Sequence, residues 1–122
     1  MLLGLLKWWR HSKMYNSPFT PFGPTYLVGT SPVQVLAKNN DNPTSYRVRN
    51  TSASAQYLSW VAPAPGNATP TITVAAPTAG NPKSATLGFL PSSVEVFGGI
   101  PPNAWFQADA AGAFEITPGE GL

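Results

Sequence analysis

Apolar and polar side chains alternate in short runs over most of the chain. In residues 93–97 the two valines fall on one face of an extended segment, while Glu95 falls on the other. The same alternation recurs in residues 114–117, and both runs are rich in β-branched and aromatic residues. This pattern is typical of antiparallel strands that have one buried face and one solvated face.

Eight or nine such runs follow one another along the chain. They are separated by stretches rich in Gly, Pro, Asn and Ser, which are the residues that turns prefer. Short strands with turns about every ten residues predict an all-β fold, namely an antiparallel β-sandwich that is jelly-roll-like. The expected strands are residues 25–28, 33–37, 45–50, 56–61, 71–75, 86–89, 93–97, 104–109 and 114–117.

The alternation also predicts the core of the sandwich. In residues 45–50, for example, Tyr46 and Val48 share one face and the two arginines share the other. The arginine face is expected to be a solvated outer surface, because charged side chains are seldom fully buried. The expected core residues are Tyr46, Val48, Leu58, Trp60, Ile72, Val74, Val94, Val96, Phe114 and Ile116.

The first thirteen residues hold the only helical pattern in the sequence. Four apolar residues have the spacing i, i+3, i+4, i+7 that places side chains on one stripe of a helix: Leu2, Leu5, Leu6 and Trp9. Positive charges follow this apolar run, whereas a signal peptide carries them before it. The run is also much shorter than the roughly 20 apolar residues that cross a bilayer. We therefore expect an extended or short-helical arm that neither directs secretion nor spans a membrane.

A proline-rich stretch, residues 15–24, links this arm to the strands. Its prolines forbid a helix and favour an extended backbone, and its aromatic residues need a surface to lie on. The chain is thus expected to divide into an arm with its linker, residues 1–24, and a β-sandwich domain, residues 25–122. Three roles are open to the arm: docking into a groove of a partner, lying on a membrane surface, or packing on its own domain as a dispensable extension.

Composition narrows the class of protein. The chain has 122 residues, enough for one domain with its own core. Only 10% of the residues are charged and none is cysteine, so neither a disulfide framework nor a thiolate metal site is available. A net charge of +2 is too small to indicate nucleic-acid binding. A surface so poor in charge suits a protein that neighbouring polypeptides cover.

Residues that carry catalysis are scarce. Nucleophilic catalysis by Ser or Thr needs a positioned base, but the single histidine, His11, lies in the arm with no carboxylate near it in the sequence. The five carboxylates form no spaced cluster such as a calcium loop. The glycine pairs precede no helix, so no phosphate-binding loop is indicated. The sequence therefore predicts no enzyme, no metal site and no cofactor.

Three segments carry a resemblance to a known class of proteins. They are residues 45–51 (SYRVRNT), residues 93–97 (SVEVF) and the closing residues 114–122 (FEITPGEGL). Together they resemble small all-β virion proteins of tailed bacteriophages. That class includes capsid decoration or cement proteins and relatives that end in a similar Thr-Pro-Gly-Glu-Gly segment. The resemblance covers about residues 26–122 and leaves residues 1–13 without a counterpart.

The resemblance implies a non-enzymatic structural protein of the virion, assembled in the host cytoplasm. Such a protein would bind the capsid surface and stabilise it, because a molecule that binds only the assembled shell favours that shell by mass action. Its partner would be the major capsid protein or another virion protein, and the chain would itself form a dimer or trimer. Neither a nucleic acid nor a membrane is expected as a partner. The candidate partner-binding residues are Leu2, Leu5, Leu6, Trp8, Trp9, Phe19 and Phe22.

An alternative function is a carbohydrate-binding or receptor-binding module of a head or tail fibre. Aromatic side chains combine an apolar face with a polar edge and can serve as stacking platforms. The candidates are Tyr57, Trp60 and Trp105. Because Trp105 and Phe106 are adjacent, they cannot both face the core, and the outward one is a candidate contact residue.

Overall fold

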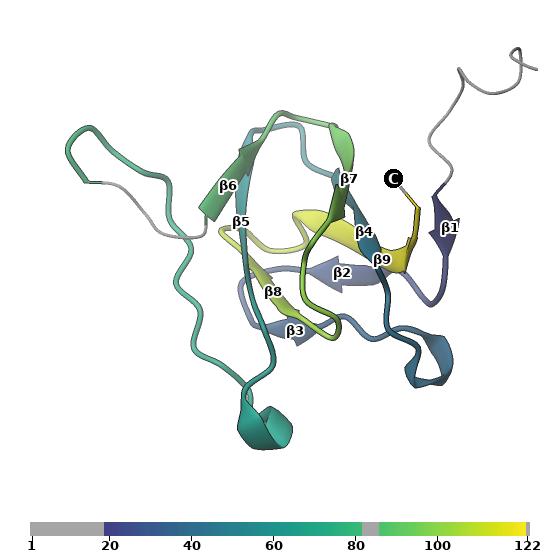
Figure 1. Cartoon of the computed structure of the whole chain (residues 1–122). Helices are drawn as coiled ribbons and strands as arrows, with labels where there is room; N and C mark the ends of the chain where they lie inside the picture. Colours follow the sequence, from purple (N-terminus) through teal and green to yellow (C-terminus); the bar gives the residue numbers. More distant parts are fainter. Residues whose placement is uncertain (1–18, 82–85, 122) are drawn as a thin grey trace, which may run out of the picture.

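The structure, a computed structural model, describes residues 19–81 and 86–121. These residues form short strands and two single turns of 3₁₀ helix, so the expected all-β fold is confirmed. The strands are β1 (Thr20–Pro21), β2 (Tyr26–Val28), β3 (Val33–Gln34), β4 (Ser45–Asn50), β5 (Gln56–Val61), β6 (Thr86–Phe89), β7 (Val94–Gly98), β8 (Trp105–Ala108) and β9 (Phe114–Glu120) (Figure 1). The 3₁₀ turns are η1 (Lys38–Asn40) and η2 (Pro65–Asn67).

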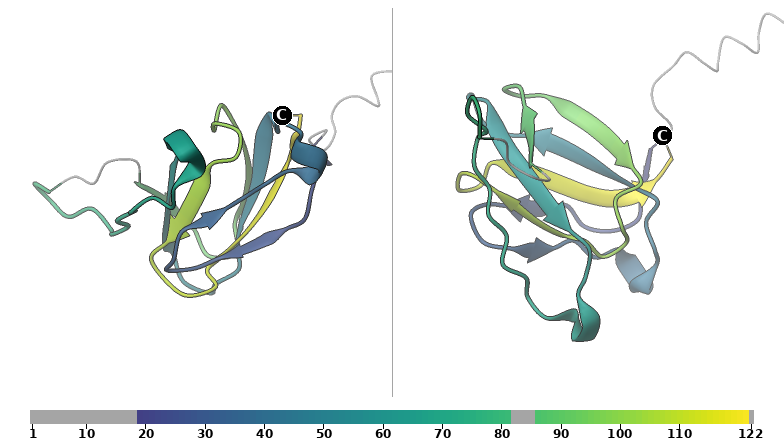
Figure 2. Two further views of the ribbon diagram at one scale, coloured as in Figure 1. Left: turned by 90° about the horizontal axis from the view of Figure 1, so that it is seen from below. Right: turned by 60° about the vertical axis from the view of Figure 1, so that its left-hand side comes forward.

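Two antiparallel sheets pack face to face, and the left-hand view of Figure 2 shows them as separate layers. Sheet A has the order β7-β4-β9, and the other side of β9 pairs with both β1 and β2. Sheet B has the order β3-β8-β5-β6. Consecutive strands mostly lie in different sheets, so the chain crosses repeatedly from one layer to the other.

The pairing of the strands follows a nested pattern. β5 pairs with β6, β4 with β7, β3 with β8 and β2 with β9, as in one long hairpin whose closed end is the β5–β6 connection. This hairpin is rolled so that β9 also pairs with β4 and β8 with β5. A rolled hairpin of this kind is a jelly roll. The jelly-roll-like sandwich expected from the sequence is therefore confirmed.

Strand β9 lies inside sheet A and fixes the proline-rich linker. It continues through Pro118, a residue that is rare inside a sheet because it has no N–H. The carbonyl oxygen of Pro118 accepts a hydrogen bond from the N–H of Phe22 (2.8 Å). Because Pro118 cannot donate in return, the carbonyl oxygen of Phe22 accepts instead from the N–H of Lys38 (2.7 Å). The described part of the linker is thus bound to the sandwich through its backbone.

Residues 71–75, expected to be a strand, join neither sheet. The expected alternation is present, since Ile72 is buried and both of its neighbours are exposed. Pro70 and Pro77 bound the segment and cannot donate to a ladder of hydrogen bonds. The segment lies instead across the outer face of sheet B, where Nε2 of Gln107 donates to the carbonyl oxygen of Ile72 (2.8 Å).

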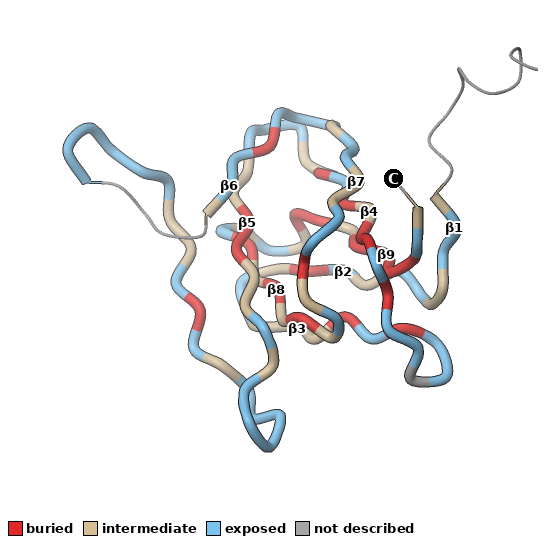
Figure 3. Tube along the Cα trace, in the orientation of Figure 1, coloured by how far each residue is buried: buried red, intermediate tan, exposed pale blue. Residues whose placement is uncertain are grey.

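The core lies between the two sheets and is built from both inner faces (Figure 3). Aromatic rings join the layers: those of Tyr46 and Phe106 lie 5.2 Å apart, and those of Phe89 and Phe114 lie 5.1 Å apart. Of the expected core residues, the buried ones are Tyr46, Val48, Leu58, Ile72, Phe114 and Ile116, and the half-buried ones are Trp60, Val74 and Val96. The core also contains residues that the alternation did not single out, chiefly Val28, Val35, Phe89, Ile100 and Phe106.

The inward face expected for β7 is wrong. Phe97 lies opposite Tyr46 in the register of β4 and β7, and Tyr46 points into the core. Phe97 is therefore the inward residue, and its ring lies 5.7 Å from that of Trp60. Val94 and Val96 lie on the outer face of sheet A, where Val94 is 45% exposed. Alternation separates the two faces of a strand, but it does not say which face the rest of the fold covers.

Candidate interaction surfaces

The outer face of sheet A is open and mixes apolar with charged side chains. Leu27 on β2 and Val94 on β7 lie at opposite edges of the sheet and are 63% and 45% exposed. The register places Glu115 and Arg49 in the same row between them. We call this surface the open face and define it by Leu27, Arg47, Arg49, Val94, Val96 and Glu115.

One ion pair crosses the open face. Nη1 of Arg49 and Oε1 of Glu115 are 2.9 Å apart, and the two side chains are 45% and 39% exposed. Arg47 lies on the same face and has no ion-pair partner among residues 19–81 and 86–121. The open face therefore carries one cation that is available to a carboxylate on a partner.

The chain enters the sandwich at one end of the open face. Gly119 of β9 shares that face with Glu115 because the two are an even number of residues apart. A Cβ at Gly119 would lie 2.5–2.7 Å from ring atoms of Phe19 and would also clash with the carbonyl oxygen of Thr20. The ring of Phe19 thus fills the space of the missing side chain, which is why this position requires glycine.

The outer face of sheet B is covered by the chain itself. Ser59 points outward on β5, opposite Gln107 of β8, and is only 3% exposed. Gln107 holds residues 71–75 on this side of sheet B, and Ile72 is buried there. A second attachment holds η2: Nε2 of Gln34 donates to Oδ1 of Asn67 (2.8 Å), and Nδ2 of Asn67 donates back to Oε1 of Gln34 (3.0 Å). We call this surface the covered face.

On one side of the sandwich, β6 is the edge strand of sheet B and β7 is the edge strand of sheet A, and the two edges leave an opening between them. Among the described strands, β6 pairs only with β5 and β7 only with β4. Leu87 on β6 and Leu90 in the following turn are 43% and 74% exposed. Leu87 lies opposite the buried Leu58, so it points inward at this opening. Apolar side chains therefore line the gap between the two strand edges, together with Glu95, which lies opposite the buried Val48 and points to the inner side of β7.

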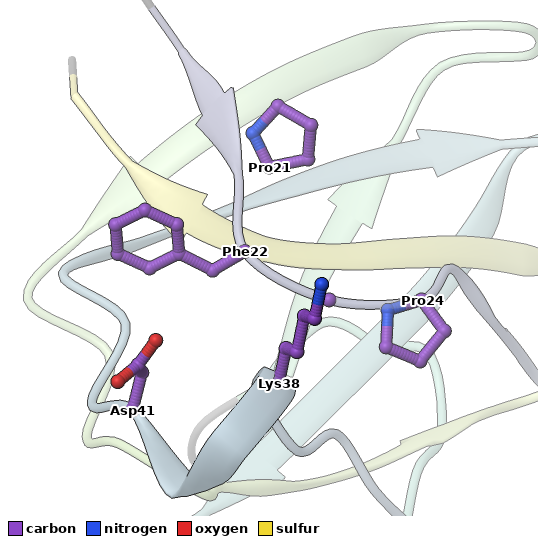
Figure 4. Close-up of a pocket in the computed structure, with 6 residues that line it drawn as sticks. Pro21, Phe22, Pro24, Lys38 and Asp41 are labelled. Atoms are coloured by element: carbon purple, nitrogen blue, oxygen red, sulfur yellow. The ribbon is translucent and has the colours of Figure 1, made fainter.

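An open pocket of about 510 Å³ lies beside the linker (Figure 4). The ring of Phe22 is half-buried there, and Lys38 and Asp41 bring one cation and one carboxylate to the pocket. Its lining residues are Pro21, Phe22, Gly23, Pro24, Lys38 and Asp41.

The aromatic platforms expected for a carbohydrate site differ in position. Trp60 points inward, with its ring 6.0 Å from that of the buried Phe106. Trp105 is the outward neighbour of Phe106 and is half-buried. Its Nε1 is buried and has no hydrogen-bond partner among the described residues. Tyr57 lies over Gly88, where a Cβ would come within 2.9 Å of Cε2 of Tyr57. Only Tyr57 and Trp105 thus lie on an outer face, and both belong to sheet B.

Titratable side chains form no metal-binding cluster in the part of the chain that the structure describes. No group of three or more His, Asp or Glu side chains gathers there to hold a metal ion. The hydroxyl of Tyr46 donates to the carbonyl oxygen of Pro101 (3.1 Å). Burial raises the pKa of Tyr46 above its ordinary value near 10, and backbone hydrogen bonds at Ala104 and Asn103 offset part of this rise. This hydroxyl therefore stays neutral and serves the core.

The residues expected to bind a partner fall into two groups. Phe19 and Phe22 are both half-buried, the first on Gly119 at the open face and the second in the pocket beside Lys38. No helix within the two described ranges is long and apolar enough to cross a membrane. The others lie outside the described residues: Leu2, Leu5, Leu6, Trp8 and Trp9.

The sequence analysis did not single out three of the most exposed apolar side chains, Leu27, Leu87 and Leu90. The signal that could have found Leu27 was the alternation of side chains between the two faces of a strand. Leu27 stands between Tyr26 and Val28, which face inward together, so the alternation assigns a large apolar side chain to the solvated face. An apolar residue at such a position indicates a contact surface when others gather near it.

The comparisons with known proteins leave these surfaces as the basis for function. No family model, no curated protein and no solved structure matches the chain. The open face, the β6–β7 side and the pocket beside the linker are therefore the features from which a function is argued.

Proposed function

We propose that this chain is a non-enzymatic structural protein of a tailed-phage virion that binds the capsid surface and stabilises the shell. Its partner is the major capsid protein or another virion protein, and it acts as a homo-oligomer. The resemblance of residues 45–51, 93–97 and 114–122 to virion proteins supports this proposal. Jelly rolls recur in viral capsids and in lectins, but a fold alone does not assign a function.

The observation that carries the proposal is that the chain covers one outer face of the sandwich and leaves much of the other exposed. The covered face is closed by the protein's own residues 71–75, with Ile72 buried there. On the open face the linker covers only the end at Thr117 and Gly119. Leu27, further along the same face, is 63% exposed. Phe19 of the linker lies at the end of the same face, and the arm, residues 1–13, precedes the linker in the sequence. The arm and the open face can therefore form one contact surface in two parts.

Two modest contacts in one chain are enough for tight attachment. Apolar area at Leu27 and Val94 contributes about 25 cal/mol for each Å² removed from water, and Arg47 can meet a carboxylate of the shell. Once one part is bound, the other acts at a high effective concentration. Each bound copy then stabilises the assembled shell, because it binds that state and not the free subunits.

Co-sedimentation with capsids of the phage that encodes the chain tests the proposal. Two variants separate the parts of the surface: deletion of residues 1–13, and Leu27→Asp on the open face. We expect each variant to weaken the affinity for capsids, measured from the fraction that pellets, by at least about tenfold. A tenfold change in Kd corresponds to the loss of roughly 1.4 kcal/mol of binding free energy. Far-UV circular dichroism should show the same β signal as the parent.

The matched control is Leu36→Asp. Leu36 is another exposed leucine, 43% accessible, in the segment after β3 and outside the open face. This control should pellet with capsids as the parent does and should raise the melting temperature of the capsid equally. Full binding by both the deletion and Leu27→Asp would refute attachment through this surface.

A further inference from the structure

Strand β7 is an edge strand of sheet A. It runs along the upper edge of the molecule in the right-hand view of Figure 2, and among the described strands it pairs only with β4. Edge strands are usually guarded by charged side chains, including ones that point inward, by proline, by a bulge or by a covering segment. β7 has the sequence Val-Glu-Val-Phe-Gly. Its one guard is Glu95, which lies opposite the buried Val48 and so points to the inner side of sheet A. Such an edge can accept a further strand through its main chain.

The hydrogen bonds of β4 show which peptide groups of β7 face that edge. The N–H of Asn50 donates to the carbonyl oxygen of Ser93 (2.9 Å). Along an antiparallel pair, residues alternate between facing the partner and facing away from it. In the register of β4 with β7, the peptide groups of Glu95 and Phe97 therefore face β4. Those that face outward belong to Val94, Val96 and Gly98.

We propose that the strand that pairs with this edge is β7 of a second copy, in an antiparallel arrangement with a two-fold axis at Val96. Val96 then lies opposite Val96 of the other copy, Val94 lies opposite Gly98, and Glu95 lies opposite Phe97. This inference rests on the homo-oligomer in the proposed function and gives it an interface. Sheet A becomes continuous across the dimer.

Two constraints select this register. Both residues of a hydrogen-bonded pair must present outward-facing peptide groups, which limits pairing to Val94, Val96 and Gly98. An axis at Glu95 would set two carboxylates directly opposite each other, which is destabilising. An axis at Phe97 would leave Val94 outside the paired segment. The axis at Val96 avoids both defects and gives three hydrogen-bonded pairs, or about six main-chain hydrogen bonds.

The same arrangement covers apolar surface. The two-fold axis stands normal to sheet A, so both copies of sheet B lie on one side and their β6 edges face each other. Leu87, 43% exposed, and the half-buried Phe97 line the opening between β6 and β7. A second copy closes this opening, which removes apolar area of Leu87 and Phe97 from water. It also sets each Glu95, which points to the same inner side of β7, opposite Phe97 of the other copy. The two open faces meanwhile point in one direction and double the surface available for docking.

Single cysteines test the register, because the chain has none of its own. In Val96→Cys the two new side chains face each other with Cα atoms about 5.5 Å apart, inside the disulfide range of roughly 4.4–6.8 Å. In Val94→Cys they lie four residues apart along the strands, roughly 14 Å. We expect mild oxidation of the full-length variants to give a covalent dimer for Val96→Cys and none for Val94→Cys.

Sedimentation provides the second readout, with Val96→Glu and its matched control Val94→Glu. Both place a carboxylate beside an arginine of β4, Arg47 or Arg49, so both leave the folded chain intact. Val96→Glu opposes two carboxylates at the axis and should weaken the dimer at least about tenfold, whereas Val94→Glu, opposite Gly98, should weaken it less than about threefold.

A parent chain that sediments as a monomer up to its solubility limit would overturn the inference. Equal crosslinking of Val94→Cys and Val96→Cys, or equal sedimentation of the two Glu variants, would also overturn it. Capsid co-sedimentation distinguishes this failure from failure of the proposed function. A chain that binds capsids without the Val96→Cys crosslink loses the β7 pairing but keeps its role on the shell.

Discussion

The two outer faces of the sandwich are built from similar strands, but their outward-pointing side chains differ in exposure. On the covered face, Ser59 points away from the core and is still only 3% exposed, on the side of sheet B where Gln107 holds residues 71–75. On the open face, Leu27 has the same outward orientation and is 63% exposed. Both faces belong to antiparallel sheets of short strands. The difference therefore comes from where the connecting loops run.

This difference separates apolar residues that serve folding from those that remain available for binding. A side chain under the loop on the covered face is buried when the domain folds, so it contributes to the free energy of unfolding. A side chain on the open face contributes little to that free energy, and its area can be buried only against another molecule. The apolar side chains of the open face are thus exposed in the isolated domain and available for binding to another molecule.

The largest effect should come from truncating the residue that closes the covered face. Ile72→Ala leaves a cavity between residues 71–75 and sheet B, and we expect it to lower the free energy of unfolding by about 2–4 kcal/mol. Leu27→Ala on the open face is the control and should change it by less than about 0.5 kcal/mol. Urea denaturation measures both. Similar losses for the two variants would mean that the faces do not differ.

The fold could be predicted largely from local signals. Alternation and turn residues set the bounds of β4, β5 and β6, which match the expected residues 45–50, 56–61 and 86–89. Tertiary context decided the rest. β9 passes through Pro118 because that residue faces the linker, where Lys38 supplies the donor that proline lacks. A local pattern carries no information on such a distant donor.

The surfaces were less predictable than the strands. The arginines of β4 were expected on an outer face, and the register places them there. That β7 turns its valines to the same face follows only from its pairing with β4. Nor does alternation along β5 show that Ser59 is buried, because Gln107, which holds residues 71–75 on this side of sheet B, is 48 residues further along the chain. Contacts of this range lie beyond a periodicity argument.

An intermediate effect should follow from releasing the loop without making a cavity beneath Ile72. Gln107→Ala removes the donor that holds the carbonyl oxygen of Ile72 at 2.8 Å, and we expect a loss of about 1 kcal/mol. Amide hydrogen exchange in residues 71–75 should become faster. The control, Gln56→Ala, removes a contact with Oγ of Ser52 at 3.2 Å, away from the loop. If that control accelerates exchange equally, Gln107 is not the anchor.

The smallest effect belongs to the open face itself. Arg49 and Glu115 form a hydrogen-bonded pair across β4 and β9, but both side chains are more than a third exposed. Water and salt screen such a pair, and it also costs side-chain entropy. A double-mutant cycle with Arg49→Gln and Glu115→Gln should give a coupling free energy below about 0.5 kcal/mol in the isolated chain.

That coupling should fall further as salt is raised from low to physiological concentration. The parallel cycle of Arg47→Gln with Glu115→Gln is the control, and it should show no coupling, since Arg47 has no ion-pair partner among the described residues. A coupling above about 1 kcal/mol that persists in salt is characteristic of a pair shielded from water. Such a result in the isolated chain would mean that something already covers the open face, and the contrast between the two faces would disappear.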